Sequence, residues 1–340
     1  MLISTTNALE ESLSQPHEST IEVLRQSGGD ILLLGAGGKM GTSLATMARR
    51  AFDAVGLANR VLAVSRFSDS SATRSLSRSG VETLQGDLFD SCFVNSLPEF
   101  DYVIYMVGQK FGTSTAPEAT WATNAFIPGI ICQKFANSNI ASFSTGNVYP
   151  LVGIDSRGSK ESDALLPMGE YAMSAVARER VLQYFCQSLD IPAVILRLNY
   201  STELRYGVLV DLARRVFCEE PIPLSTGYFN CIWQGDANNM TLRSLTHVSS
   251  PPRVLNLTGP ETISCRDVCL RFGELMGREV TFLGSEEPTA LLSDSAVACQ
   301  LLGDPLVNIN EMIERTAHWV ANSGEFLDAP THFEVRDGKF

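Results

Sequence analysis

The chain has 340 residues, of which 44% are hydrophobic and 19% are charged, so it can bury a large core and is not mainly disordered. The 26 Lys and Arg against 38 Asp and Glu leave a net charge of −12, and nucleic acid is not expected as a partner because it binds to clustered cations. No apolar run is long enough to span a membrane and no signal peptide is recognisable, which favours a cytoplasmic protein with a small-molecule substrate and no membrane partner.

The first 29 residues are predicted to form a loose arm and one short helix. Ser19 and Glu22 have the spacing of a capping box, and Gly28 would end the helix.

Residues 30–198 alternate apolar strand patterns with helical patterns. The expected strands are 31–34, 61–64, 81–84, 102–107, 140–143 and 193–198, and the main helices are 41–52, 118–137 and 171–189. Strands separated by helices in this way predict an α/β fold with a doubly wound (Rossmann) parallel sheet. This dinucleotide-binding domain is expected to include residues from about 232 to 260 as well, with a strand at 254–257.

The remaining sequence is less regular and predicts a smaller mixed α/β substrate-binding portion. It comprises residues from about 199 to 231 together with 261–340. Helices are expected at 209–217, 264–276 and 310–320, and a polar tail that is solvated or lies between subunits follows them.

A glycine-rich loop follows the first strand of the predicted sheet. Its spacing, G-x-x-G-x-x-G, places glycine at Gly35, Gly38 and Gly41, with Lys39 and Met40 between the last two. Such a loop lets the backbone approach a pyrophosphate closely, and the next helix offers its free N–H groups to the phosphates. The loop therefore predicts a dinucleotide site, NAD or NADP.

The end of the second strand bears on the choice of coenzyme. An acidic residue there would hold the ribose hydroxyl of NAD. The chain has Ser65 and Arg66 instead, which suit a 2′-phosphate. NADP is therefore favoured over NAD, although an exposed loop arginine without this role is the alternative.

Together these motifs resemble the extended short-chain dehydrogenase/reductases, the NAD-dependent epimerase/dehydratase family. The matching segments are the glycine loop, Gly86-Asp87-Leu88, Asp101-Tyr-Val-Ile-Tyr, Asn124, Ser144-Thr145-Gly-Asn-Val-Tyr149, Tyr171-Ala-Met-Ser174 and Leu196-Arg197.

The resemblance implies roles for particular residues. Asp87, with Leu88 beside it, would contact the adenine, and Asn124 would support an active-site helix. Thr145 would orient the substrate oxygen, and Tyr171 would be the general acid or base. A homodimer formed through helices near 118–137 and 171–189 is the family expectation.

The sequence departs from the family at one catalytic position. The family motif is Tyr-x-x-x-Lys, whereas here Ala175 replaces the lysine that binds the nicotinamide ribose and lowers the tyrosine pKa. A phenol has an ordinary pKa of about 10, so little phenolate is expected at pH 7. Reduction needs only the neutral phenol as acid, so any activity is expected to favour reduction. Arg178, Lys110 or Lys160 could supply the missing charge.

Three further departures concern the substrate. Gly146-Asn147 replaces the acidic pair of the 4,6-dehydratases. Tyr200 lies where nucleotide-sugar enzymes of the family usually carry an asparagine. Those enzymes also carry an arginine just before a His-Val-Asp-Asp-like segment, and the corresponding stretch here is Phe229-Asn-Cys-Ile-Trp-Gln-Gly-Asp236. We expect an NAD(P)-dependent oxidoreductase that acts on a carbonyl or hydroxyl of a small polar, sugar-like molecule. An NAD(P)-dependent epimerase and a non-catalytic dinucleotide-binding sensor or scaffold are the alternatives.

No metal site is predicted. The four histidines are dispersed and the eight cysteines have no CxxC pair, which is typical of reduced, buried thiols. His332, Glu334 and Asp337 in the tail could be ligands, but a solvated or intersubunit tail is the simpler interpretation.

Overall fold

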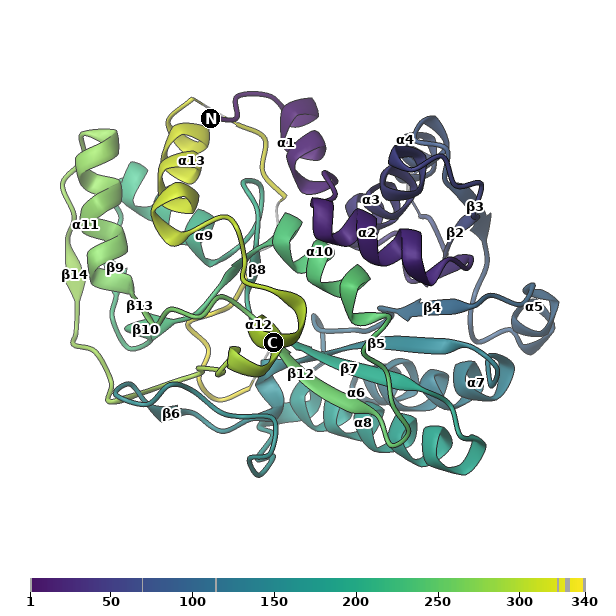
Figure 1. Cartoon of the computed structure of the whole chain (residues 1–340). Coiled ribbons are helices and arrows are strands. Elements are labelled where there is room, and N and C mark those ends of the chain that lie inside the picture. Colours follow the sequence, from purple (N-terminus) through teal and green to yellow (C-terminus); the bar gives the residue numbers. More distant parts are fainter. Residues whose placement is uncertain (1, 69, 114, 323, 328–330, 339–340) are drawn as a thin grey trace.

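The main sheet has seven strands, all parallel. The computed structural model describes residues 2–338 except 69, 114, 323 and 328–330. The strands follow the order β3 (Glu82–Gln85), β2 (Val61–Ser65), β1 (Ile31–Leu34), β4 (Tyr102–Tyr105), β5 (Asn139–Thr145), β7 (Ala193–Leu198) and β12 (Arg253–Leu257). The order reverses between β1 and β4, and ligands of such sheets bind in the crevice at this point. The predicted doubly wound parallel sheet is confirmed (Figure 1).

Apolar strands explain why helices cover both faces of the sheet. In β1, Ile31 and Leu33 belong to one core and Leu32 and Leu34 to the other. The first core includes side chains of α2 (Glu18–Ser27), α3 (Gly41–Ala54), α4 (Ser70–Arg78), α10 (Gln234–Ser244) and α12 (Ala296–Leu302). The second includes side chains of α5 (Ser91–Ser96), α7 (Ile127–Lys134) and α8 (Gly169–Leu189). Across the described residues, no helix is both long and apolar enough for a membrane span.

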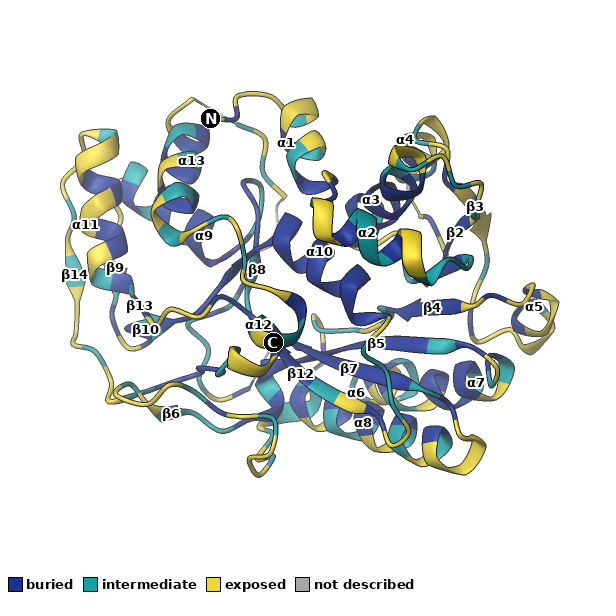
Figure 2. Ribbon diagram, in the orientation of Figure 1, coloured by how far each residue is buried: buried dark blue, intermediate teal, exposed yellow. Residues whose placement is uncertain are grey.

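A third core holds the smaller portion of the molecule together. It contains side chains of α1 (Thr6–Leu13), α9 (Val208–Phe217), α11 (Cys265–Met276) and α13 (Ile309–Ala321). Two-residue strands pair beside these helices: β8 (Ser201–Thr202) with β11 (Ile232–Trp233), β9 (Ile222–Pro223) with β14 (Phe282–Leu283), and β10 (Tyr228–Phe229) with β13 (Ile263–Ser264). A further pair, β6 (Val152–Gly153) with β15 (Thr289–Ala290), lies near the sheet domain. Figure 2 shows the inward faces of these helices as buried.

The N-terminal segment differs from the loose arm with one helix that the sequence predicts. It forms two helices, and Leu9 and Leu13 of the first are fully buried. The predicted capping box is wrong, because α2 already begins at Glu18 with His17 as its N-cap. The backbone N–H of His17 donates to Asn239 Oδ1 at 2.7 Å, so a partner far along the chain fixes where this helix begins.

The helix predicted over 118–137 is interrupted. It comprises α6 (Pro117–Trp121), a π-helical turn η1 (Ala122–Phe126) and α7. Pro128 has no N–H to donate to the carbonyl of Asn124, as an α-helix would require. That carbonyl instead accepts a hydrogen bond from Arg178 Nε at 3.3 Å. The interruption therefore links this helix to α8.

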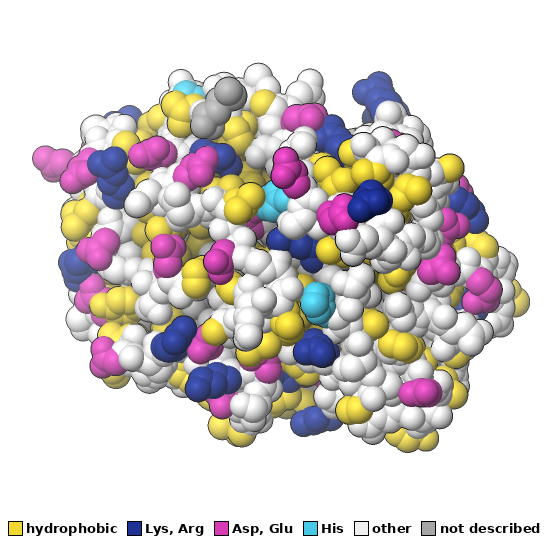
Figure 3. All heavy atoms as spheres, viewed as in Figure 1, with side chains coloured by type: hydrophobic (Ala, Val, Ile, Leu, Met, Phe, Trp, Pro, Cys, Tyr) yellow, Lys and Arg dark blue, Asp and Glu magenta, His cyan; other side chains and the backbone are white. Residues whose placement is uncertain are grey.

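Charged side chains are spread over the surface. On the face shown in Figure 3, acidic and basic side chains are interspersed around α2, α11 and α13. The tail, expected to be solvated or intersubunit, instead packs against its own chain where it is described: Thr331 and Phe333 are buried.

Candidate active site

The glycine loop forms an open cradle at the crevice between β1 and β4. Gly35 has φ +92°, and a Cβ there would lie 2.9 Å from Val107 Cγ2, so this turn requires glycine. Gly38 is different, because the protein atom nearest to its hypothetical Cβ is 3.5 Å away. Packing within the protein therefore does not exclude a side chain at Gly38. The space in front of it suits the close approach of a pyrophosphate.

The start of α3 supplies the partial positive charge that complements a pyrophosphate. In the described structure, the backbone N–H groups of Lys39 and Met40 have no hydrogen-bond partner. Gly41 begins the helix, and its hypothetical Cβ would lie 2.4 Å from the Ala36 carbonyl oxygen. Free N–H groups at the N-terminus of a 14-residue helix attract phosphate.

A cavity of about 570 Å³ extends from this loop on one side. Its lining includes Gly38 and four further residues that the sequence singles out, Ser65, Arg66, Asp87 and Leu88. Asp87 Oδ1 accepts a hydrogen bond from the N–H of Phe89 at 3.0 Å, and Arg66 is exposed at the rim. The residues present thus fit the adenosine half of a dinucleotide.

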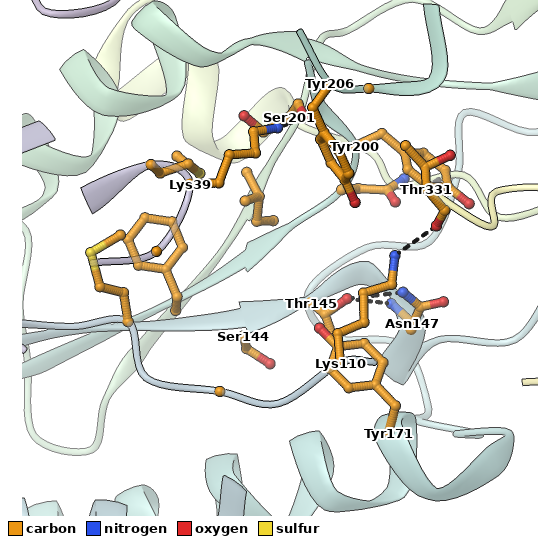
Figure 4. Close-up of a pocket in the computed structure, with 18 of the residues that line it drawn as sticks. Lys39, Lys110, Ser144, Thr145, Asn147, Tyr171, Tyr200, Ser201, Tyr206 and Thr331 are labelled. Carbon is orange, nitrogen blue, oxygen red and sulfur yellow. Dashed lines mark hydrogen bonds between the residues drawn. The ribbon is translucent and has the colours of Figure 1, made fainter. Parts of the chain in front are cut away.

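A second cavity, of about 290 Å³, continues from the loop on the other side (Figure 4). It shares Gly35, Gly38 and Lys110 with the first and is also lined by Thr145 and Tyr171. The structure therefore brings both predicted catalytic hydroxyl residues to the side of the loop opposite Asp87 and Arg66. This is the arrangement that a coenzyme extending through both cavities requires.

The hydroxyl group of Thr145 is oriented by Asn147. Thr145 Oγ1 accepts two hydrogen bonds, from the backbone N of Asn147 at 3.2 Å and from its Nδ2 at 3.1 Å. A threonine hydroxyl has two acceptor positions and one proton to donate. Both acceptor positions are filled, so the proton is left for a ligand oxygen in the cavity. The sequence singled out Asn147 only as the replacement of an acidic residue.

Tyr171 lies in the first turn of α8, at the edge of the cavity. Its backbone carbonyl accepts from Ser174 Oγ at 2.9 Å. Gly169, which begins the helix, has φ +81°, and a Cβ there would lie 2.1 Å from the Gly338 carbonyl oxygen. The C-terminal segment therefore contacts the helix start that positions Tyr171.

Asn124 and Arg178 form a buried network behind the cavity. Asn124 Oδ1 accepts from Gln109 N at 2.8 Å and from Arg178 Nη2 at 2.7 Å. Its Nδ2 donates to Gln109 O at 3.0 Å and to Ser174 Oγ at 2.9 Å. Arg178 Nη1 donates to Phe143 O at 3.0 Å. Asn124 is thus fully hydrogen-bonded and holds the loop after β4 against α8.

Arg178 also lines the cavity that contains Tyr171. It lies seven residues after Tyr171, on the same face of α8. Its guanidinium is therefore a cation beside the cavity. It comes from the same helix in which Ala175 replaces the lysine of the family motif.

Two half-buried lysines complete the positive charge of this cavity. Lys39 Nζ donates to Ser201 O at 2.9 Å and lies 4.2 Å from the centre of the Tyr206 ring. Lys110 Nζ donates to Thr331 O at 3.0 Å. Burial lowers the pKa of each lysine to about 8. The third lysine considered from the sequence, Lys160, is exposed and does not line this cavity.

Two tyrosines that sequence reasoning did not assign to the site face these lysines. Tyr200 has φ +47°, a left-handed conformation that costs a bulky residue about 1–3 kcal/mol and is concentrated at functional sites. Burial, with Asp211 and Tyr171 nearby, raises the pKa of Tyr206 to about 12. The only sequence signal was Tyr200 in place of an asparagine.

The C-terminal segment lines part of this cavity through Thr331 and is held in place by several contacts. Thr331 donates to Asp211 Oδ2 from its backbone N at 3.0 Å and from its hydroxyl at 2.5 Å. The ring of Phe333 packs against Phe229, with 6.3 Å between centroids. Arg336 donates to Thr289 O at 2.9 Å and to Thr289 Oγ1 at 2.8 Å. Nothing in the sequence of the tail indicated this position.

The profile of the NAD dependent epimerase/dehydratase family matches residues 31–201, half of the chain. The chain belongs to this family of NAD-dependent enzymes. No curated protein sequence matches it significantly.

Solved structures of similar fold cover most of the chain. UDP-glucuronic acid 4-epimerase from Bacillus cereus is 18% identical, with a TM-score of 0.71 over 86% of this chain and 98% of that chain. UDP-glucose 4-epimerase from Thermotoga maritima is 16% identical, with a TM-score of 0.70 over 86% and 99%. DesIV, a dTDP-glucose 4,6-dehydratase from Streptomyces venezuelae, is 15% identical, with a TM-score of 0.72 over 85% and 96%. At such low sequence identities, these structural similarities establish the fold alone.

Proposed function

We propose that the chain is an NAD(P)-dependent oxidoreductase that reduces the carbonyl group of a small polar substrate. The observation that carries the proposal is the Thr145 hydroxyl, whose two acceptor positions are filled by Asn147, in one cavity with Tyr171. A nicotinamide coenzyme bound along the glycine loop would supply the hydride.

The residues of the cavity are suited to the charge that develops during such a reduction. As the carbonyl becomes an alcohol, negative charge builds on its oxygen. Thr145 donates a hydrogen bond to that oxygen, and the Tyr171 phenol delivers the proton. Arg178 adds positive charge from α8 and stabilises the developing anion. Since this requires only a neutral phenol, the reaction is biased towards reduction.

Tyr171→Phe tests this assignment with reduced coenzyme and a panel of small oxo compounds. We expect turnover to fall by about 10²-fold or more while coenzyme affinity is retained, because only the proton donor is removed. Tyr184→Phe, on the exposed side of the same helix, is the matched control and should keep full turnover. Wild-type turnover by Tyr171→Phe would contradict the proposal.

The two alternatives predict different products. An epimerase would interconvert stereoisomers without net consumption of coenzyme. Because the structural relatives described above are named for nucleotide-sugar substrates, UDP-glucose and UDP-glucuronic acid should be included in this assay. A binding-only protein would bind coenzyme and turn over nothing.

We further propose NADP as the preferred coenzyme, on the basis of Ser65 and Arg66 at the rim of the larger cavity. Arg66→Asp should weaken NADPH binding by about tenfold or more and leave NADH binding unchanged or stronger, because a carboxylate repels a 2′-phosphate. Calorimetric titration with both coenzymes measures this, and an unchanged NADPH affinity would exclude the role of Arg66.

A further inference from the structure

The smaller cavity is positively charged although the whole chain carries a net charge of −12. Lys39, Lys110 and Arg178 line it, and no Asp or Glu does so in the described part of the chain. Arg178 already donates to three protein oxygens. The two lysines therefore carry the charge that the mechanism above does not use.

Both lysines extend from the coenzyme-binding sheet to the smaller portion of the molecule. Lys39 comes from the loop after β1 and reaches Ser201 in β8, and Lys110 comes from the loop after β4 and reaches Thr331 in the C-terminal segment. Figure 4 shows both side chains directed to the side of the cavity that carries Tyr200 and Tyr206. They thus face the part that would hold the substrate rather than the adenosine half of the coenzyme.

The electrostatic interactions indicate that an anion would stabilise this arrangement. Burial, together with the charge of Lys110, lowers the pKa of Lys39 to about 8, and Glu203 and Asp211 only partly oppose this shift. Asp211 likewise opposes the shift of Lys110, and Arg205 adds to the repulsion on Lys39. Two like charges facing one desolvated cavity are stabilised by a bound negative group.

We infer, on the basis of the proposed reduction, that the substrate is a small anion. A carboxylate or phosphate group binds between Lys39 and Lys110 while the carbonyl of the same molecule lies at Thr145 and Tyr171. The cavity volume of about 290 Å³ sets the small size of the substrate, and Thr331 of the C-terminal segment lines the cavity.

The test uses malonate and inorganic phosphate as probes, titrated calorimetrically into the full chain saturated with NADPH or NADH. Saturation with coenzyme fills the glycine loop that would bind the pyrophosphate, so the measured binding of the probes reports on the second cavity. We expect one anion to bind per chain, and Lys39→Met and Lys110→Met each to weaken it by about tenfold or more. The preferred probe distinguishes a carboxylate from a phosphate substrate.

Control variants separate charge from folding. Lys39→Arg keeps the charge and should retain affinity to within about threefold, and Lys160→Met removes an exposed lysine outside the cavity and should have no effect. Thermal unfolding identifies any variant that fails to fold. Unchanged anion affinity in both folded methionine variants, or no anion binding to the wild-type complex, would overturn the inference. So would methionine variants that lose coenzyme affinity but keep anion affinity.

The inference and the proposed function can fail separately. Tyr171→Phe, which should lower turnover by about 10²-fold or more, should bind the anion as tightly as the wild type. If no oxo compound is reduced but anion binding still depends on Lys39 and Lys110, the site stands and the reaction is wrong. If Tyr171→Phe stops reduction but the lysine variants bind anions normally, the reaction stands and the anion site is wrong.

Discussion

The pair Thr145 and Asn147 shows how one side chain sets the direction of another. Asn147 donates to Thr145 Oγ1 from both its backbone and its side chain. The Asn147 amide therefore makes Thr145 Oγ1 the acceptor of this hydrogen bond. An aspartate has the same shape but would accept instead of donate, so it would reverse the direction of the hydrogen bond.

Asn147→Asp is expected to lower kcat by about tenfold or more and to lower it further than Asn147→Ala does, with coenzyme affinity unchanged. A carboxylate accepts instead of donating, so the Thr145 proton would turn away from the cavity. Steady-state kinetics should also show the aspartate variant recovering at acidic pH as the carboxyl is protonated. Equal effects of the two substitutions, without pH dependence, would indicate a merely structural role.

The half-buried lysines Lys39 and Lys110 should reduce the stability of the folded chain. Their folded pKa of about 8 lies below the unfolded value of 10.5, so the stability penalty of each is fully present below pH 8 and decreases up to pH 10.5. Lys39→Met should therefore raise the free energy of unfolding at pH 7 by on the order of 1–3 kcal/mol. Urea unfolding at pH 7 and pH 10 measures this. A variant that is less stable at pH 7, or whose gain does not shrink at pH 10, would contradict the argument.

At the scale of single residues, the sequence indicated several of the residues that line the two cavities, but not the contacts that hold them there. The glycine loop is recognisable from its spacing, and Asp87, Thr145 and Tyr171 from the family resemblance; all three of these residues line one of the two cavities. Tyr206 and Thr331 are not recognisable in either way, because their positions depend on chain segments that meet only in the folded molecule.

At the scale of elements, apolar periodicity predicted the sheet strands and the longest helix, α8, but not the interruption of the helix over 118–137 or the existence of α10. Its sequence, Gln-Gly-Asp-Ala-Asn-Asn-Met-Thr, is polar, yet the whole helix is buried. Gln234 and Asn238 bond to Ser43 Oγ, and Asn239 bonds to the carbonyl of Gln15. Partners from distant segments satisfy several of the polar groups of this helix, and a single-sequence pattern does not show such partners.

The contact of α2 with α10 should be sensitive to acid. Burial, with Arg243 nearby, lowers the pKa of His17 from 6.5 to about 4, so the unfolded chain binds a proton between these values that the folded chain does not. Folding stability should fall as the pH drops from 6.5 to 4. In His17→Asn, the decrease of the free energy of unfolding between pH 6.5 and 4 should be smaller by about 1 kcal/mol. This value is reduced to allow for the partial exposure of His17. An identical pH dependence of urea unfolding in both proteins would rule out this role.

At the scale of the whole molecule, the family resemblance implies a homodimer. Phe126 in the π turn is 61% exposed and Tyr184 on α8 is 65% exposed, and both lie in the segments expected to pair. Exposed apolar side chains on neighbouring elements are typical of an interface.

Phe126→Asp combined with Tyr184→Asp should convert a dimer into a monomer, because each introduces a charge that an apolar interface cannot solvate. Analytical ultracentrifugation of the full chain measures this. Leu283→Asp, at a site 54% exposed in the smaller portion, is the matched control and should leave the mass unchanged. A wild-type monomer, or a double variant that remains dimeric, would contradict the prediction.

Both the proposed reduction and the proposed anion site require a dinucleotide to lie across Gly38. Calorimetric titration of NADPH and NADH into the wild-type chain and Gly38→Val tests this most directly, because a side chain at Gly38 meets no protein atom closer than 3.5 Å at its Cβ. We predict that one coenzyme binds per wild-type chain and that Gly38→Val keeps its melting temperature but loses at least about tenfold in affinity. A wild-type chain that binds neither coenzyme, or a valine variant that binds equally well, would contradict the account.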